Sequence, residues 1–320
     1  MSVFFKAPWW LTNGHAQTLW ASKIRARPVL STHRERWELN DGDFLDLDFT
    51  DVANATADTP VVLVLHGLAG SIDSKYASSI LQTLQQHGYR GVLMHFRSCS
   101  GEANRLPRSY HSGETTDPRY VIQQLQHRFP QAPLAAIGYS LGGNVLLKLL
   151  GEQAVSGLQT AIAISVPFEL ASCANRLNRG FSKFYRDYLL RGMKKSLRLK
   201  LKTVALPIDH KAALRCRDFW EFDNLVTAPL HGFRDVHDYY AQSSSRAYIP
   251  NIQTPTLILH ALDDPFMTHD CIPTAAELPA CVQLELSDHG GHVGFRQHQG
   301  YWLETRILHH LQNTLPLSIA

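Results

Sequence analysis

The sequence has few cysteines, no long apolar run and almost no excess of charge of either sign. Its five cysteines are scattered and form no C-x-x-C pair, which argues against a disulfide framework and against a zinc ribbon. The longest apolar runs, such as residues 61–65, are far shorter than the roughly 20 residues that a membrane-spanning helix needs. Lys and Arg number 31 against 28 Asp and Glu, a balance that excludes nucleic-acid binding through bulk charge.

The chain also lacks the signs of export and of disorder. No apolar segment follows a charged start near residue 1, so we expect no secretory signal and a cytoplasmic protein with reduced cysteines. Hydrophobic residues make up 44% and charged residues 18% of the 320 residues, which is ordinary for a soluble globular chain. A large buried core is therefore possible, and wholesale disorder is excluded.

Short apolar segments alternate with helical patterns along most of the chain. Segments rich in Val, Ile and Leu predict buried strands at residues 61–65, 91–96, 134–137 and 256–261, with weaker candidates at 161–166 and 282–286. Apolar residues with a 3.6-residue period predict a helix over 74–87. Such alternation is typical of an α/β protein with a mostly parallel sheet that is covered on both faces.

Two further elements are predicted by their boundary residues. Residues 34–39 and 44–49 flank Asn40-Asp41-Gly42, which predicts an antiparallel hairpin at the edge of the sheet. Asp117 and Pro118 predict the start of another helix, with Asp117 as N-cap and Pro118 at the first helical position.

The alternation stops between about residues 167 and 232, where no strand pattern occurs. Within this segment, apolar side chains recur every four residues and predict a helix with one apolar stripe, formed by Tyr185, Leu189, Met193, Leu197 and Leu201. We interpret 167–232 as a helical cap inserted into a single domain that spans 1–320. We expect residues 1–32 to form an N-terminal arm packed on the core.

The same helical stretch is basic, because eight of the residues in 183–202 are Lys or Arg and only Asp187 is acidic. We expect the stripe to face the domain and five cations to point outward: Arg191, Lys194, Lys195, Arg198 and Lys202. Two interpretations stay open at this point. The cations form a solvated helix face, or they make a weak peripheral contact with an anionic membrane surface.

The most specific motif is Gly138-Tyr139-Ser140-Leu141-Gly142, which follows the predicted strand at 134–137 and precedes a helical pattern. Strand, sharp turn and helix is the arrangement of a nucleophile elbow. The flanking glycines allow a tight turn, and the N-terminus of the following helix favours developing negative charge. This context favours Ser140 as a nucleophile over a tight turn with an incidental serine.

A serine hydroxyl needs a base, and in this architecture an acid and then a histidine follow the serine along the chain. Asp263 and Asp264 directly follow one predicted strand, and His289 and His292 lie in the glycine-rich loop after the next. We choose Asp264, because the proline after it biases it towards a turn. We choose His292, because two glycines before it let the loop reach over the serine.

The oxyanion hole of such an elbow uses the amide after the nucleophile and one from the first strand-to-helix loop. That loop is His66-Gly67-Leu68-Ala69-Gly70. We therefore expect the backbone N–H groups of Leu68 and Leu141 to stabilise the negative oxygen of a tetrahedral intermediate.

Together these segments resemble an α/β-hydrolase of the YheT-like esterase family. The resemblance covers almost the whole chain and also rests on residues 13–18, 96–101, 110–113, 228–233, 263–266 and 289–295. It implies the α/β-hydrolase fold, with a mostly parallel eight-stranded sheet, helices on both faces and a helical cap insertion. The sequence departs from the family at Ser98, usually glycine, and at His95, usually asparagine.

The resemblance implies a serine hydrolase that cleaves carboxylic esters (EC 3.1.1.-), similar to carboxylesterases and monoacylglycerol lipases, through Ser140, His292 and Asp264. The expected partner is a short- to medium-chain or lipid-derived ester, with no nucleic acid. No cofactor is expected, and no metal, because the histidines form no ligand cluster with carboxylates. The alternatives are an acyltransferase or thioesterase with the same triad, and a non-catalytic lipid-binding protein on the same fold.

Overall fold

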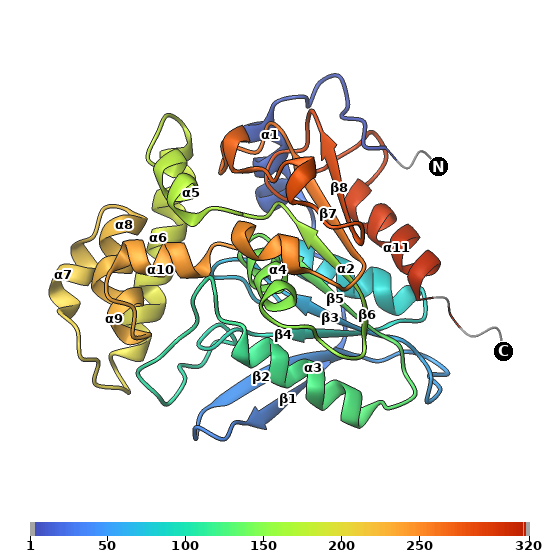
Figure 1. Ribbon diagram of the computed structural model, residues 1–320, viewed down its shortest axis with the longest axis horizontal. Coiled ribbons are helices and arrows are strands. Elements are labelled where there is room, and N and C mark those ends of the chain that lie inside the picture. Colours follow the sequence, from blue (N-terminus) through green and yellow to red (C-terminus); the bar gives the residue numbers. More distant parts are fainter. Residues whose placement is uncertain (1–3, 316, 318–320) are drawn as a thin grey trace.

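The centre of the computed structural model, which describes residues 4–315 and 317, is an eight-stranded sheet (Figure 1). The strand order is β1-β2-β4-β3-β5-β6-β7-β8. β1–β2 and β2–β4 are antiparallel, and every other neighbouring pair is parallel. The strands are β1 Thr32–Glu38, β2 Phe44–Thr50, β3 Val61–Leu65, β4 Arg90–Met94, β5 Leu134–Tyr139, β6 Leu158–Ile164, β7 Thr256–Ala261 and β8 Val282–Ser287. The predicted eight-stranded, mostly parallel sheet is confirmed.

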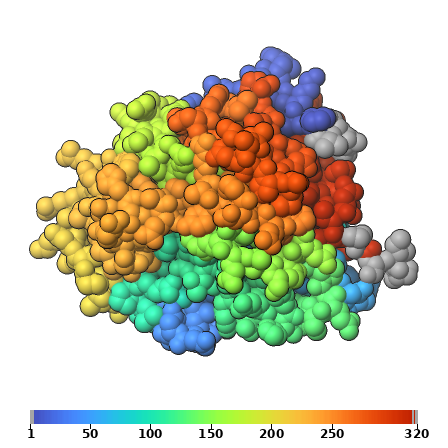
Figure 2. Space-filling model, viewed as in Figure 1, coloured from blue at the N-terminus to red at the C-terminus, as the bar shows by residue number. Residues whose placement is uncertain are grey.

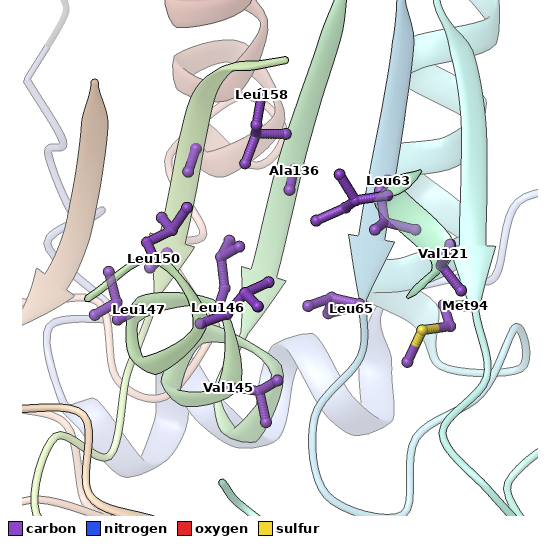
Figure 3. Close-up of a cluster of buried hydrophobic side chains, with 14 of the residues drawn as sticks. Leu63, Leu65, Met94, Val121, Ala136, Val145, Leu146, Leu147, Leu150 and Leu158 are labelled. Atoms are coloured by element: carbon purple, nitrogen blue, oxygen red, sulfur yellow. The ribbon is translucent and has the colours of Figure 1, made fainter. Parts of the chain in front are cut away.

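Helices cover both faces of the sheet because its central strands are apolar on both sides. In β3, Leu63 and Leu65 belong to one hydrophobic cluster, and Val62 and Val64 belong to another, as the two-residue period of a strand requires. The first cluster includes residues of α3 (Thr116–Arg128) and α4 (Leu141–Glu152), and the second includes residues of α2 (Lys75–Gln86) and α11 (Trp302–Thr314). Figure 3 shows leucines of α4 among side chains of the neighbouring strands.

Three predicted boundaries are wrong. The strand predicted at 91–96 is β4, which ends at Met94. The N-cap of α3 is Thr115, and Asp117 lies in the first turn, where its carboxylate accepts hydrogen bonds of 2.7 and 2.8 Å from Arg97. Both of these side chains are buried, so the ion pair determines the place of Asp117. The sixth strand is also earlier than the predicted 161–166, because Ser165, with φ of +50°, turns the chain after Ile164.

Residues 165–255, all of which the structure describes, contain helices and no strand. Residues 182–243 of this segment form a group that projects at one end of the molecule (Figures 1 and 2, mainly yellow), and the 3-10 turn η3 (Arg246–Asn251) packs on α4. The α-helices are α5 Leu170–Leu177, α6 Ser182–Lys200, α7 His210–Arg215, α8 Phe219–Phe222, α9 Ala228–Leu230 and α10 Val236–Ser243, and η2 Asp223–Thr227 is a π-helix. None of the helices formed by residues 4–315 and 317 has the length and apolar composition needed to cross a membrane.

The predicted stripe of α6 packs into two hydrophobic clusters, one along its first half and one along its second half, which share Met193. Tyr185 and Leu197 are buried, and the other three stripe residues are partly buried. Leu190, which lies outside the predicted stripe, is also buried. The reason is that residues of α7, α8 and η2 cover a second side of α6.

One of the five cations that were expected to point outward is partly buried, and a further cation of α6 is fully buried. Lys194 is partly buried and donates to the carbonyl oxygen of Cys216, so the prediction that it points outward is wrong. Lys200 is buried, donates to the carbonyl oxygen of Arg108, and has a pKa that burial lowers to about 8. The other four predicted cations are exposed: Arg191, Lys195, Arg198 and Lys202.

Candidate active site

Ser140 lies at the turn between β5 and α4, with φ of +52° and ψ of −118°. A Cβ atom added at Gly138 would collide with the backbone of Gly142, and one added at Gly142 would collide with the carbonyl group of Leu65. The two glycines therefore let the strand and helix approach closely enough to hold this strained turn. Because Ser140 is the N-cap of α4, its hydroxyl lies at the positive end of that helix.

The structure brings the three predicted side chains into one hydrogen-bonded chain. The Nδ1 atom of His292 lies 2.8 Å from Oδ2 of Asp264, and its Nε2 atom lies 2.9 Å from Oγ of Ser140. A carboxylate can only accept, so Nδ1–H donates to Asp264 and Nε2 is left to accept the serine proton. Asp264 is almost completely buried, whereas His292 is slightly exposed, which leaves the proton-accepting side of the chain open to a substrate.

Phe266 fixes the plane of the imidazole ring. Its ring is stacked on that of His292, with centroids 3.9 Å apart and an interplanar angle of 4°. The backbone N–H of Phe266 donates to Oδ1 of Asp264 over 2.9 Å, so the same residue also holds the carboxylate. The short turn after β7 thus positions both partners of the acid–histidine pair.

The two rejected candidates, Asp263 and His289, lie next to each other and away from Ser140. Their nearest side-chain atoms are 3.6 Å apart, and Oδ1 of Asp263 accepts from the backbone N–H of Gly291 over 2.8 Å. Burial raises the pKa of Asp263. Asp263 therefore holds the backbone of the histidine loop and does not contact the imidazole of His292.

The candidate oxyanion hole is formed by the loop after β3 and the first residue of α4. The hydroxyl of Tyr76 accepts from Gly67 N–H over 2.7 Å, and that of Tyr110 accepts from Ala69 N–H over 2.8 Å. Between them, Leu68 N–H donates to no acceptor recorded among residues 4–315 and 317, and the same holds for Leu141 N–H. Leu68, Leu141 and Ser140 all line one cavity.

The N-terminal arm contacts the histidine loop, which the sequence interpretation missed. In α1 (Gly14–Leu19), Thr18 Oγ1 accepts from the backbone N–H of His292 over 2.9 Å and donates to the carbonyl oxygen of Gly14 over 2.7 Å. Gln17, which has no exposed surface, accepts from the N–H of Arg296 over 2.7 Å and donates to its carbonyl oxygen over 3.0 Å. The polar residues in the segment 13–18 could have indicated this contact, since an arm that only packs on the core does not need polar side chains.

Ser140 and His292 open into a cavity of about 370 Å³, within the range of small-molecule sites. Its wall is mainly apolar and comes largely from the helices between β6 and β7, including Leu170, Leu177, Leu189, Met193, Leu197 and Phe219. The described residues offer no group of three His, Cys, Asp or Glu side chains that could hold a metal ion. The arrangement therefore presents the Ser140 hydroxyl, hydrogen-bonded to a histidine, to a mainly apolar cavity.

One buried acid interrupts this apolar wall. Asp223 accepts hydrogen bonds from the hydroxyl groups of Thr227 and Tyr240, the latter over 2.8 Å. Burial raises the pKa of Asp223 to about 6. No sequence pattern pointed to this residue, because its burial depends on how α8, η2 and α10 pack together.

Ser98 stands where the family usually has glycine. It has φ of +66°, a conformation that glycine adopts more readily. Its N–H donates to Oδ1 of Asn104 and its hydroxyl accepts from Asn104 N–H over 3.2 Å. The second departure, His95, is buried with Nε2 2.7 Å from Oδ2 of Asp48. Both departures are accommodated by local hydrogen bonds outside the Ser140–His292–Asp264 chain.

Comparisons with known proteins agree with the fold and show the family. Residues 60–299 match the sequence profile of the alpha/beta hydrolase fold. The chain is 43% identical to the Escherichia coli protein named "Putative esterase YheT" over 92% of this chain and 89% of the relative. It is 29% identical to human "Phospholipase ABHD3" over 92% and 73%, and 32% identical to the Saccharomyces cerevisiae "Monoacylglycerol lipase" over 74% and 55%.

Among solved structures, an esterase of Pyrococcus furiosus, Pf2001, superposes with a TM-score of 0.61 at 16% identity, over 91% of this chain and 97% of that one. That similarity shows the fold. The profile match and the identity to the Escherichia coli relative show more: the chain belongs to the α/β-hydrolase family, in the group that contains the YheT esterase-like proteins.

Proposed function

We propose that this protein is a serine hydrolase that cleaves carboxylic esters through an acyl-enzyme. The observation that carries the proposal is the unbroken chain from Asp264 through His292 to Ser140 at the mouth of an apolar cavity. The names of the relatives, an esterase, a phospholipase and a monoacylglycerol lipase, support the same reaction class.

In the first half-reaction, Oγ of Ser140 attacks the ester carbonyl carbon while Nε2 of His292 takes the hydroxyl proton. The carbonyl oxygen becomes negative and accepts hydrogen bonds from the N–H groups of Leu68 and Leu141. The proton on Nε2 then passes to the leaving alcohol, and the acyl group remains on Ser140. Asp264 holds the imidazole tautomer throughout and stabilises the imidazolium.

In the second half-reaction, water takes the place of the alcohol. His292 removes a proton from the water, the resulting hydroxide attacks the acyl-enzyme, and the carboxylic acid leaves as Ser140 regains its proton. No cofactor enters either step. The apolar side chains of the cavity suit the acyl chain, so we infer short- to medium-chain acyl esters, including lipid-derived ones, as the substrate class.

A panel of p-nitrophenyl esters of increasing acyl length tests this proposal, with Ser140→Ala as the matched control. We expect saturable hydrolysis with a maximum at short or medium chain length and no burst of p-nitrophenol from the variant. An acyltransferase would instead transfer the acyl group to an added alcohol faster than to water. Hydrolysis that survives in Ser140→Ala would overturn the proposed mechanism.

A further inference from the structure

Six large apolar side chains from two distant parts of the chain are exposed near the candidate active site. We call them the aromatic ridge: Trp9, Trp10, Ile24, Phe181, Phe184 and Tyr188. Each is more than 40% exposed, and Trp9 reaches 86%. Single exposed apolar residues are ordinary, but several of them on neighbouring segments mark an interaction site. The ring of Trp10 lies 5.2 Å from that of Trp20, in the same helical turn, residues 20–24, that holds Lys23 and Ile24.

Side-chain contacts join the two segments into one surface. The ring of Phe181 lies 4.9 Å from that of His15 in α1, and Nζ of Lys23 lies 4.0 Å from the ring centre of Tyr188 in α6. Phe181 and Phe184 are stacked with centroids 5.7 Å apart. Figure 1 places α1 and α5, which directly precedes α6 in the chain, towards the same side of the molecule.

Exposed cations accompany the ridge along both segments. Lys23 and Lys183 are exposed beside it, and Arg191 and Lys195 are exposed further along α6. The only acidic residue of α6 is Asp187, which is paired with Arg186 at 2.8 Å. An exposed combination of Trp, Tyr and Phe with Lys and Arg matches the interfacial region of an anionic bilayer, where rings insert at the headgroup level and cations face phosphate.

The ridge is linked to the reacting groups by a short row of rings. Phe181 contacts Tyr185 with ring centroids 5.9 Å apart, Tyr185 contacts Phe266 at 5.1 Å, and Phe266 is stacked on His292. The next two turns of α6, including Leu189 and Met193, line the cavity. A surface bound at the ridge would therefore lie beside the cavity that receives the acyl chain.

We propose that the aromatic ridge docks this protein on an anionic lipid surface. A second copy of the chain fits less well, because a two-fold contact through the ridge would bring the basic α6 of one copy against the basic α6 of the other. The docking itself needs no catalysis, but its use in delivering lipid-derived esters to Ser140 rests on the function proposed above.

The test is co-sedimentation with vesicles of phosphatidylcholine alone and of phosphatidylcholine with phosphatidylglycerol. The wild-type protein should bind the anionic vesicles more tightly, and added salt should weaken that binding. The double variant Trp9→Ala/Tyr188→Ala should bind about tenfold or more weakly, because each ring loses its apolar contact with lipid. Leu286→Ala, an exposed residue of β8, is the matched control and should bind like wild type.

Two further measurements separate the possible failures. Ser140→Ala should be inactive and should bind vesicles like wild type. A wild-type protein that binds vesicles but hydrolyses no ester would contradict the catalytic proposal alone. Soluble-ester hydrolysis should be unchanged in Trp9→Ala/Tyr188→Ala. Absence of vesicle binding by the wild type, equal binding by the double variant, or a dimer in sedimentation velocity that the double variant dissociates would each overturn docking on lipid.

Discussion

The carboxyl edge of the sheet and the helical segment between β6 and β7 both line the cavity, but different forces position their side chains. At the sheet edge, backbone geometry decides: strand ends, strained turns and glycines place Ser140 and Asp264 wherever the fold is kept. In the helical segment, side-chain burial decides, and the same helix α6 buries Leu197 and Lys200 while it exposes Phe184. The edge is suited to fixed chemistry, and the helical segment to variable recognition.

Removing a reacting group at the edge should have the largest effect. Ser140→Ala and His292→Ala should each lower kcat for a soluble ester by about 10⁶, since triad members act as a unit. The double variant should be little worse than either single one. Circular dichroism checks that the fold is kept, and a single variant with more than about a tenth of wild-type activity would show that the triad is wrongly assigned.

The two adjacent aspartates offer a sharper comparison within the edge. Asp264→Asn should lower kcat by about 10⁴, because the amide can no longer hold His292 in the tautomer that accepts the serine proton. Asp263→Asn keeps an oxygen to accept from Gly291 N–H and should cost less than about tenfold. Equal losses would mean that the two carboxylates share the role, and the reverse order would move it to Asp263.

Asp223 should make the stability of the helical segment depend on pH. Burial raises its pKa from 3.8 to about 6, so the folded protein favours the neutral form. Its contribution to the free energy of unfolding is full below about pH 4 and is lost as pH rises through about 6, by about 3 kcal/mol.

Asp223→Asn removes this titration, and the hydroxyl groups of Thr227 and Tyr240 can rotate to accept from the amide. Urea unfolding at pH 4 and pH 8 measures the difference. The free energy of unfolding of the variant, relative to that of wild type, should be higher at pH 8 than at pH 4. A constant difference would show that Asp223 is already ionised in the folded protein.

A smaller effect is expected from the N-terminal arm. It tests how far the histidine loop at the sheet edge depends on a segment that is distant in the sequence. Thr18→Val removes the acceptor of His292 N–H and should lower kcat about tenfold with little change in KM, because an unpaired buried amide costs about 1–3 kcal/mol. Ser22→Ala, which removes a hydroxyl on the exposed side of the same arm, is the control. If both variants keep wild-type kcat, the arm does not position the histidine loop.

Two leucines of α6 allow the effect of a substitution on substrate recognition to be distinguished from its effect on stability. Leu197 and Leu190 are both buried, but only Leu197 is among the residues that line the cavity. Leu197→Ser and Leu190→Ser should each reduce stability by about 2 kcal/mol. Only Leu197→Ser should shift the acyl-length profile and raise KM more than it lowers kcat for short esters. The same profile in both variants would mean that this side of α6 does not shape the pocket.

The sequence predicts the edge well because its signals are local and ordered along the chain. Apolar runs give the strands, the glycines around Ser140 give the elbow, and chain order gives the acid and the histidine. It predicts the helical segment less well, because the burial of Lys194, Lys200 and Asp223 depends on contacts between helices distant in sequence. The exposed rings at 181, 184 and 188 recur with a helical period, next to the stripe residue Tyr185. The period does not show that these rings stay exposed, because that depends on what packs against α6.

The arm falls between these two cases. Its polar motif at 13–18 is visible in the sequence, but a motif without a partner says nothing about what it holds. Thr18 and Gln17 act on residues 292 and 296, more than 270 positions away, so only the folded structure reveals the contact.

The most direct test of the account is to locate the nucleophile chemically. Incubation with a fluorophosphonate, followed by peptide mass spectrometry, should find one adduct, on the peptide that contains Ser140. Labelling should disappear in Ser140→Ala and become very slow in His292→Ala, because the hydroxyl then has no base. No adduct on the folded wild-type protein, an adduct on another residue, or unchanged labelling of His292→Ala would contradict the assignment of Ser140 as an activated nucleophile.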